Sequence, residues 1–82
     1  MQPANHYASK TQIPQFVEDL IEIECRDGLA HLIRRLATSV LDQREFDETP
    51  YSEDSKEYLE WILDQDDDTK GSLLKWIVNE LI

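Results

Sequence analysis

The chain is poor in the residues that form crosslinks, tight turns or catalytic centres. Its 82 residues include one cysteine, two glycines, two histidines and three prolines. The single cysteine, Cys25, cannot form an internal disulfide, and its apolar neighbours predict a buried free thiol. Gly28 and Gly71 are far apart, which excludes a glycine-rich phosphate-binding loop.

Catalytic residue patterns are also missing. His6 lies close to the N-terminus, and His31 follows Cys25 by six residues, a spacing that does not place a thiol and an imidazole on one helical face. His31 is instead expected at the surface of a helix. No serine has the context of a nucleophile elbow, and no set of residues has the spacing of a metal site. We therefore expect a protein that is not an enzyme and binds no cofactor.

The sequence has neither a long hydrophobic run nor an excess of bases. No apolar stretch approaches the ~20 residues that cross a bilayer. The first ten residues lack the basic start and the apolar segment of a signal peptide. The net charge of −10 repels nucleic acid and anionic membranes, both of which bind proteins through lysine and arginine. We expect a cytoplasmic protein that binds neither of them directly.

Acidic residues are abundant, and they are concentrated in one window. Residues 42–68 contain twelve carboxylates and two bases, so the charge of this window equals that of the whole chain. Segregated charge creates a directional field that attracts partners of the opposite sign. The bases Arg34 and Arg35 are expected to pair with these acids, or with Glu18 and Glu22. The expected partner is a protein with a basic surface.

Apolar periodicity predicts an all-α fold, a small bundle of about four short helices in which an acidic loop separates two helix pairs. Residues 1–10 have no pattern and are expected to form a flexible N-terminal arm, so residues 11–82 make a single helical domain. A first helix follows Thr11 as its N-cap. A second follows Asp27, after a break at residues 25–28, because the two apolar stripes would face opposite sides of one continuous helix. The stripes are Ile13, Phe16, Val17, Leu20 and Ile21, then Leu29, Leu32, Ile33, Leu36, Ala37, Val40 and Leu41.

The second half of the chain predicts a loop and two more helices. Phe46 and Tyr51 are expected to anchor the loop over residues 44–51. A third helix starts at Ser52 or Asp54, with a pattern from Asp54 that resembles a capping box, and Thr69 is the expected cap of a fourth. The stripes of these helices are Tyr58, Leu59, Ile62 and Leu63, then Leu73, Leu74, Ile77, Val78 and Leu81.

The candidate binding residues are acids of the third helix and two tryptophans. Acids that are spaced by three, four or seven residues lie along one helical side. Trp61 and Trp76 flank the two stripes, where each would either widen the core face or anchor a partner at an interface. The expected partner-binding residues are Glu53, Asp54, Glu57, Glu60, Trp61, Asp64 and Trp76.

One acidic turn partly resembles a calcium-binding loop. Asp64, Asp66 and Asp68 occupy the first, third and fifth positions of an EF-hand. Thr69 stands where that loop needs glycine, and Lys75 stands where it needs glutamate. A solvated acidic turn is the simplest interpretation, and a weak calcium-responsive protein is a further alternative.

Together these features predict a small acidic interaction module, a regulator or inhibitor that docks a basic surface of a partner protein. Carboxylates placed where phosphates would lie would let it occupy a nucleic-acid groove, so a nucleic-acid-binding protein is one such partner. The main alternative is a structural subunit of a homo-oligomer, such as a homodimer, or of a larger complex. A third interpretation is that the acidity only confers solubility.

Overall fold

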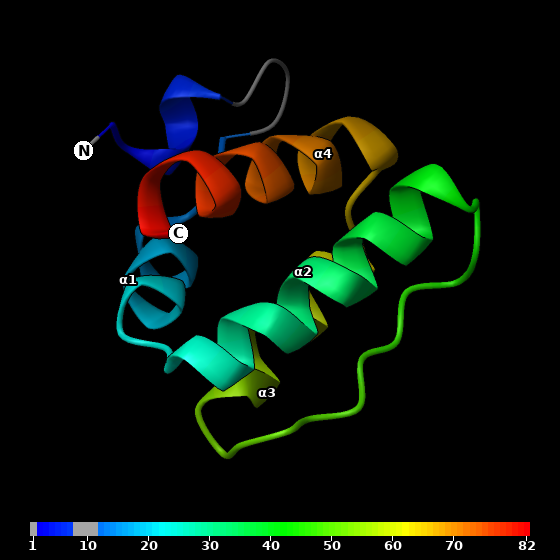
Figure 1. Cartoon of the computed structure of the whole chain (residues 1–82), viewed down its shortest axis with the longest axis horizontal. Coiled ribbons are helices and arrows are strands. Elements are labelled where there is room, and N and C mark those ends of the chain that lie inside the picture. Colours follow the sequence, from blue (N-terminus) through cyan, green and yellow to red (C-terminus); the bar gives the residue numbers. More distant parts are fainter. Residues whose placement is uncertain (1, 8–11) are drawn as a thin grey trace.

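The four predicted helices are present and pack as two pairs. The computed structural model describes residues 2–7 and 12–82. The chain forms a 3₁₀ helix η1, then α1 and α2, a long loop, α3 and α4, and a π-helical segment η2 (Figure 1). The bounds are η1 (Ala4–His6), α1 (Gln15–Glu22), α2 (Arg26–Leu41), α3 (Ser55–Leu63), α4 (Asp67–Trp76) and η2 (Ile77–Leu81). The described residues contain no strand, which confirms the all-α prediction.

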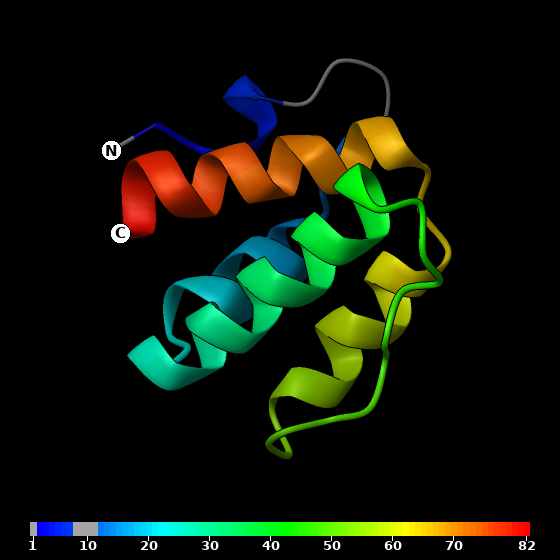
Figure 2. The same cartoon turned by 45° about the vertical axis from the view of Figure 1, so that its right-hand side comes forward.

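Helix α1 packs mainly against α3, and α2 packs mainly against α4, which lies across the bundle (Figure 2). Each pair therefore joins helices from the two sides of the acidic loop, whereas the prediction paired the helices on the same side of it. The predicted stripe of α2 supplies Leu29, Leu32 and Leu36 to the core. The loop between α2 and α3 contributes Phe46, which is buried, and Tyr51, which packs against the core, so both predicted anchors are confirmed. None of the helices in the described part of the chain has the length and apolarity needed to span a membrane.

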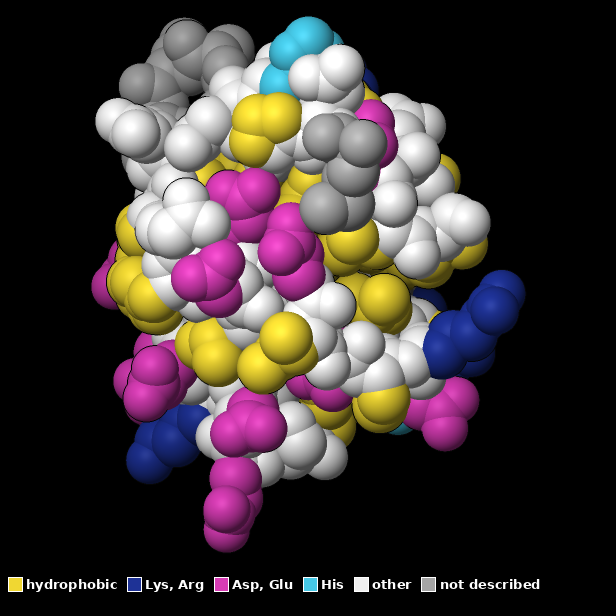
Figure 3. Space-filling view, turned by 90° about the vertical axis from the view of Figure 1, so that its left-hand side faces the viewer, with side chains coloured by type: hydrophobic (Ala, Val, Ile, Leu, Met, Phe, Trp, Pro, Cys, Tyr) yellow, Lys and Arg dark blue, Asp and Glu magenta, His cyan; other side chains and the backbone are white. Residues whose placement is uncertain are grey.

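Helix α1 departs from its predicted stripe at one position. Ile13, Val17 and Ile21 are fully buried, but Phe16 is 46% exposed. Ile23, just after the helix, is 72% exposed. Figure 3 shows the side of the molecule that carries α1, where hydrophobic side chains lie among acidic ones and Lys and Arg lie at the margins. The apolar stripe of α1 is therefore wider than the surface that the rest of the protein covers.

Part of the predicted N-terminal arm is packed on the bundle. The segment 2–7 includes η1, which packs against α4, and Ala4 is fully buried. The backbone N–H of Ala4 donates to Glu18 Oε1 over 3.2 Å, so this buried carboxylate has a partner. The remaining residues of the predicted arm, and Thr11, lie outside the described residues. Helix α1 begins at Gln15 with Pro14 as its N-cap residue, so the prediction that it starts after a cap at Thr11 is wrong.

Two further contacts attach the N-terminal segment to the end of the bundle. The Tyr7 hydroxyl donates to Glu80 Oε1 over 2.5 Å, and the indole N–H of Trp76 donates to the Gln2 carbonyl over 3.2 Å. The hydrogen bond from Tyr7 is the main cause that holds the pKa of the Glu80 carboxyl below its usual value. The segment predicted to be a flexible arm therefore covers part of α4 and η2.

The break between α1 and α2 is confirmed, but its cap differs from the prediction. Cys25 is the N-cap residue, and its Sγ accepts a hydrogen bond from the backbone N–H of Gly28 over 3.4 Å. Asp27 and Gly28 consequently lie inside the first turn of α2, and the thiol is exposed instead of buried. The Glu24 side chain folds over Gly28, which explains why a residue without a side chain stands there.

The two glycines allow a paired test of the packing. Gly71→Ala is expected to raise the free energy of unfolding by about 0.5–1 kcal/mol, because Gly71 is helical and an added Cβ would meet no atom within 4 Å. At Gly28 an added Cβ would lie 2.4 Å from Glu24 Oε1, so Gly28→Ala should give no such gain. Thermal unfolding of both variants measures the difference. Equal stabilisation by the two alanines would contradict this packing.

Candidate functional site

Helix α3 has one buried side and one acidic side. Its buried residues are Ser55, Tyr58, Leu59 and Ile62, all with no exposed surface. An advance of ~100° per residue places the predicted acidic residues on the opposite side of the helix. All five are exposed, and we call them the acidic α3 face: Glu53, Asp54, Glu57, Glu60 and Asp64. The structure therefore brings together the acids that the spacing predicted.

The charge of the acidic α3 face is not neutralised within the described residues. None of its five carboxylates forms an ion pair with a described base, and the ion pair at 3.9 Å between Arg35 and Asp47 involves the preceding loop. Lys56 is the only base within α3, and it is exposed. The face can therefore project its field into solvent over about a Debye length, ~8 Å at physiological salt.

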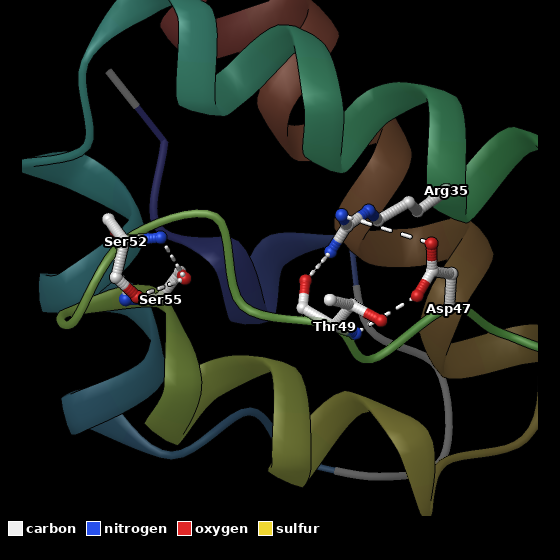
Figure 4. Close-up of polar contacts among 5 residues, drawn as sticks. All are labelled: Arg35, Asp47, Thr49, Ser52 and Ser55. Carbon is white, nitrogen blue, oxygen red and sulfur yellow. Dashed lines mark hydrogen bonds and ion pairs between the residues drawn. The ribbon is translucent and has the colours of Figure 1, made fainter.

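The long loop fastens the start of α3 to α2 (Figure 4). Arg35 of α2 donates a hydrogen bond to the Thr49 carbonyl and pairs with Asp47. The backbone N–H of Thr49 donates to Asp47 Oδ1 over 2.9 Å and is the main cause that lowers the pKa of this carboxyl. Arg35 thus pairs with the acidic window, one of its predicted partners, and the other prediction, a pair with Glu18 or Glu22, is not seen for Arg35.

A serine pair caps α3 in place of the predicted capping box. The backbone N–H of Ser55 donates to Ser52 Oγ over 3.2 Å, and the backbone N–H of Ser52 donates to Ser55 Oγ over 3.1 Å (Figure 4). Asp54 makes no side-chain cap hydrogen bond. Since Ser52 accepts the first N–H group of α3, the Asp54 carboxylate is left for the acidic α3 face.

A chain of aromatic and polar contacts supports the buried side of α3. The Tyr51 ring stacks on the exposed His31 with ring centres 5.3 Å apart, and the Arg35 guanidinium lies 4.9 Å from the centre of the same ring. The hydroxyls of Tyr51 and Tyr58 are hydrogen-bonded to each other, and Tyr58 donates to Glu24 Oε2 over 2.6 Å. Burial raises the pKa of Tyr51 to about 12. These contacts join the loop, α2 and the turn before it, and α3 into one packed unit.

The two tryptophans lie in different environments. Trp76 has no exposed surface, so the prediction that it contacts a partner is wrong. Trp61 is partly exposed and packs against the edge of the core. Only Trp61 therefore lies where a partner of the acidic α3 face could touch it.

The acidic turn before α4 serves as a helix cap. Asp66 Oδ1 accepts a hydrogen bond from the backbone N–H of Thr69 over 2.9 Å, so Asp66 is the cap and the predicted cap Thr69 is buried inside the helix. Within residues 2–7 and 12–82, no group of three or more His, Cys, Asp or Glu side chains is arranged to hold a metal ion. Asp64, Asp66 and Asp68 consequently do not form the calcium site that their spacing suggested.

Sequence reasoning missed the exposed apolar side chains of the α1 side. Phe16 and Ile23 are seven residues apart, a spacing that places both on one side of a helix. Phe16 belongs to the predicted core stripe and Ile23 does not, and periodicity alone does not show how much of a stripe is covered. A comparison of the width of the apolar stripe with the number of helices available to cover it indicates that some of its apolar side chains stay exposed.

Comparison with known proteins assigns no family: no protein-family model matches the chain, and no curated protein or solved structure is significantly similar to it. A small helical bundle is compatible with many unrelated functions. A function for this chain therefore has to be argued from the chemistry and geometry of its surface.

Proposed function

We propose that the protein is a small cytoplasmic interaction module without catalytic activity, which regulates or inhibits a partner protein by docking a basic surface on the acidic α3 face. The observation that supports this is the row of five exposed carboxylates opposite the buried side of α3, none paired with a described base. Such carboxylates can bind a partner's lysines and arginines without first breaking an internal ion pair.

The geometry favours fast and selective association. A concentrated field of one sign steers an oppositely charged protein and raises the association rate. Trp61 adds a large, rigid contact surface beside the acids. The contacts of Arg35 and the serine cap order the start of α3 in the free protein, which lowers the entropy that binding would cost.

Surfaces that bind nucleic acid are the basic surfaces that best match this description. They place lysine and arginine at phosphate spacing, and carboxylates on a rigid helix can occupy the same positions. Inhibition by occupation of a nucleic-acid groove is therefore the form of regulation that we favour.

A structural subunit of a homo-oligomer or larger complex is the second candidate. It is supported by exposed apolar side chains at three separate places, the end of α2 and the residues just after α1 and η2, with Leu41 at 73%, Ile23 at 72% and Ile82 at 63% exposure. Assembly through such side chains predicts weak salt dependence and a melting temperature that rises with protein concentration. Docking through the acidic α3 face predicts instead an affinity for the partner that falls steeply as the salt concentration rises, because salt screens the charges.

Reversing four charges tests the leading proposal. The partner is first identified by affinity capture at low salt and mass spectrometry. The variant Glu53→Lys, Asp54→Lys, Glu57→Lys and Glu60→Lys should then bind it about a hundredfold more weakly, if each of the four exposed pairs contributes about 0.7 kcal/mol. Calorimetric titration at two salt concentrations measures the change.

A control variant with the same change in net charge separates the effect of the acidic α3 face from the effect of the overall charge. It reverses four exposed acids elsewhere: Asp27, Asp42, Glu45 and Asp67. This variant should bind with close to the original affinity. An unchanged affinity in the first variant would refute docking through the acidic α3 face, and equal losses in both would assign the effect to net charge alone.

A further inference from the structure

Helix α1 exposes a second surface that combines apolar and acidic side chains. Phe16 is 46% exposed and Ile23 is 72% exposed, while Asp19 and Glu22 are also exposed. We call these four residues the α1 face. Phe16 and Ile23 are separated by two helical turns, roughly 10 Å along the axis, with Asp19 between them. Figure 3 shows this side, where acidic side chains cluster with hydrophobic ones beside them.

The exposed apolar side chains of the α1 face are not needed to bury the core of the bundle. Val17 and Ile21 on the inner side of α1 already fill that role with no exposed surface. Covering Phe16 and Ile23 would remove further apolar surface from water, which favours association. Phe16 and Ile23 are seven residues apart, and side chains at this spacing form a ridge along which a second helix can pack.

A hollow of about 300 Å³ adjoins the α1 face. Leu29 and Leu81 line it with apolar surface, and Glu22 and Glu24 supply carboxylates. Glu22 belongs to both the hollow and the α1 face, so the two form one continuous surface. This surface offers apolar contacts with acids at its edge, and among the described residues Arg26 is the only base that lines the hollow.

The charge of α1 decides which kind of molecule can cover this surface. The helix contains Glu18, Asp19 and Glu22 and no lysine or arginine, and it packs against α3, whose outer side is the acidic α3 face. A second copy of the chain would bring the same acids together, and like charges oppose such contact. An anionic membrane meets the same repulsion. A basic partner gains both charge pairing and apolar contact.

We propose that the α1 face and the adjoining hollow bind a basic amphipathic helix of the partner protein. Its apolar stripe lies on Phe16 and Ile23, and its flanking lysines and arginines pair with Asp19 and Glu22. This inference rests on the proposed function and specifies the element that is recognised. The acidic α3 face steers the partner, and the α1 face supplies the apolar anchors.

The test uses the full chain and two synthetic peptides of about 18 residues, long enough for five helical turns. One carries leucines at helical spacing among lysines, and the other has the same composition in scrambled order. The double variant Phe16→Ser and Ile23→Ser should bind the amphipathic peptide at least about tenfold more weakly than the original chain. Leu41→Ser is the matched control, because Leu41 is as exposed as Ile23 and lies on α2. It should leave the affinity unchanged.

Backbone amide shifts in NMR spectra show where the peptide binds, and the shifts should centre on α1. If the double variant does not fold by circular dichroism, Ile23→Ser alone keeps the test decisive, since Ile23 lies outside the helix body. Equal binding of the scrambled peptide, together with unchanged affinity in the double variant, would overturn the inference. So would absence of amphipathic-peptide binding at low salt, or self-association that the double variant abolishes.

The charge-reversed α3 variant distinguishes this inference from the proposed function. If the α3 variant loses peptide binding and the double variant Phe16→Ser and Ile23→Ser keeps it, only the role of the α1 face is overturned. Binding that survives charge reversal on α3 and is lost in the double variant supports the α1 face and overturns steering by the acidic α3 face.

Discussion

Replacing Trp76 with alanine is expected to lower the free energy of unfolding by about 3–5 kcal/mol, the usual cost of emptying a buried aromatic site. Trp76 is the largest side chain with no exposed surface, and its indole N–H donates to the Gln2 carbonyl over 3.2 Å. A domain of 82 residues has roughly 4–12 kcal/mol of stability in total. Urea denaturation followed by circular dichroism should therefore show a large fall in the midpoint.

Trp61→Ala is the matched control for this prediction. It removes the same side chain from a partly exposed position on α3, and the expected loss is below about 1.5 kcal/mol. Trp76→Phe keeps most of the volume and loses the hydrogen bond to Gln2, so an intermediate loss of about 1–2 kcal/mol is expected. Equal losses in the two alanine variants would show that Trp76 does not occupy the centre of the core.

The pattern of α4 left open whether Trp76 widens the core face or contacts a partner, because that pattern assumes a single covered side. In the structure α2 packs against α4, and η1 covers a further part of it. The N-terminal segment has no apolar periodicity, so nothing in the sequence indicates that it lies there. The π-helical turn of η2 shifts the register as well, and Val78, predicted in the core, is 47% exposed.

Lys70 is a second residue of α4 whose position the sequence did not indicate. Only 8% of it is exposed, and its ammonium group donates to Ser39 Oγ over 3.1 Å and lies 5.5 Å from the centre of the Phe46 ring. A lysine in an amphipathic helix is normally expected at the surface. Here the polar and aromatic contacts, made with residues remote in sequence, stabilise the amine in a buried position.

Helix positions were easier to predict than helix caps. The apolar stripes determine where α2 and α3 lie, because several residues agree on one face. Several neighbouring side chains can serve as the N-cap of a helix, and their capping free energies differ little. At the start of α2 a tertiary contact affects the choice, since Tyr58 binds the Glu24 carboxylate and the chain turns at Cys25, ahead of the predicted Asp27.

The acidic α3 face was predictable for the same reason as the helix itself. Once the buried side of α3 is known from its apolar residues, the side of each acid follows from helical geometry. Exposure of Phe16 does not follow from the apolar periodicity of α1 alone, since this helix carries more apolar positions than the elements around it cover. Periodicity shows neither which helices become neighbours nor how much of a stripe they cover, and only the width of the stripe indicates an excess.

Raising the pH above about 10 is expected to destabilise the protein, because two tyrosines remain protonated in the fold. Burial raises the pKa of Tyr51 to about 12, and burial together with the hydrogen bond to Glu24 raises the pKa of Tyr58. In the unfolded chain both hydroxyls ionise near the ordinary value of 10.0. Their contribution to stability is therefore complete below about pH 10 and is lost progressively as the pH rises towards 12.

The variant Tyr58→Phe separates this effect from general repulsion in an acidic protein. Above about pH 10, each tyrosine that stays protonated in the fold lowers the free energy of unfolding by up to about 1.4 kcal/mol per pH unit. Tyr58 is fully buried and Tyr51 is partly exposed, so Tyr58 should cause the larger part of this loss. Near neutral pH, Tyr58→Phe should cost about 1–2 kcal/mol, because Glu24 and Tyr51 each lose a hydrogen-bond partner. Lysine deprotonation affects both proteins alike.

Urea unfolding at several pH values between about 8 and 12 measures the two stability curves. With one buried phenol fewer, the Tyr58→Phe variant should lose stability less steeply with rising pH, so its curve should approach that of the original chain. Parallel curves above pH 10 would show that Tyr58 is not held protonated by the fold. In that case the contact between Tyr58 and Glu24, which orders the start of α2 against α3, would be too weak to explain the rigidity of the acidic α3 face.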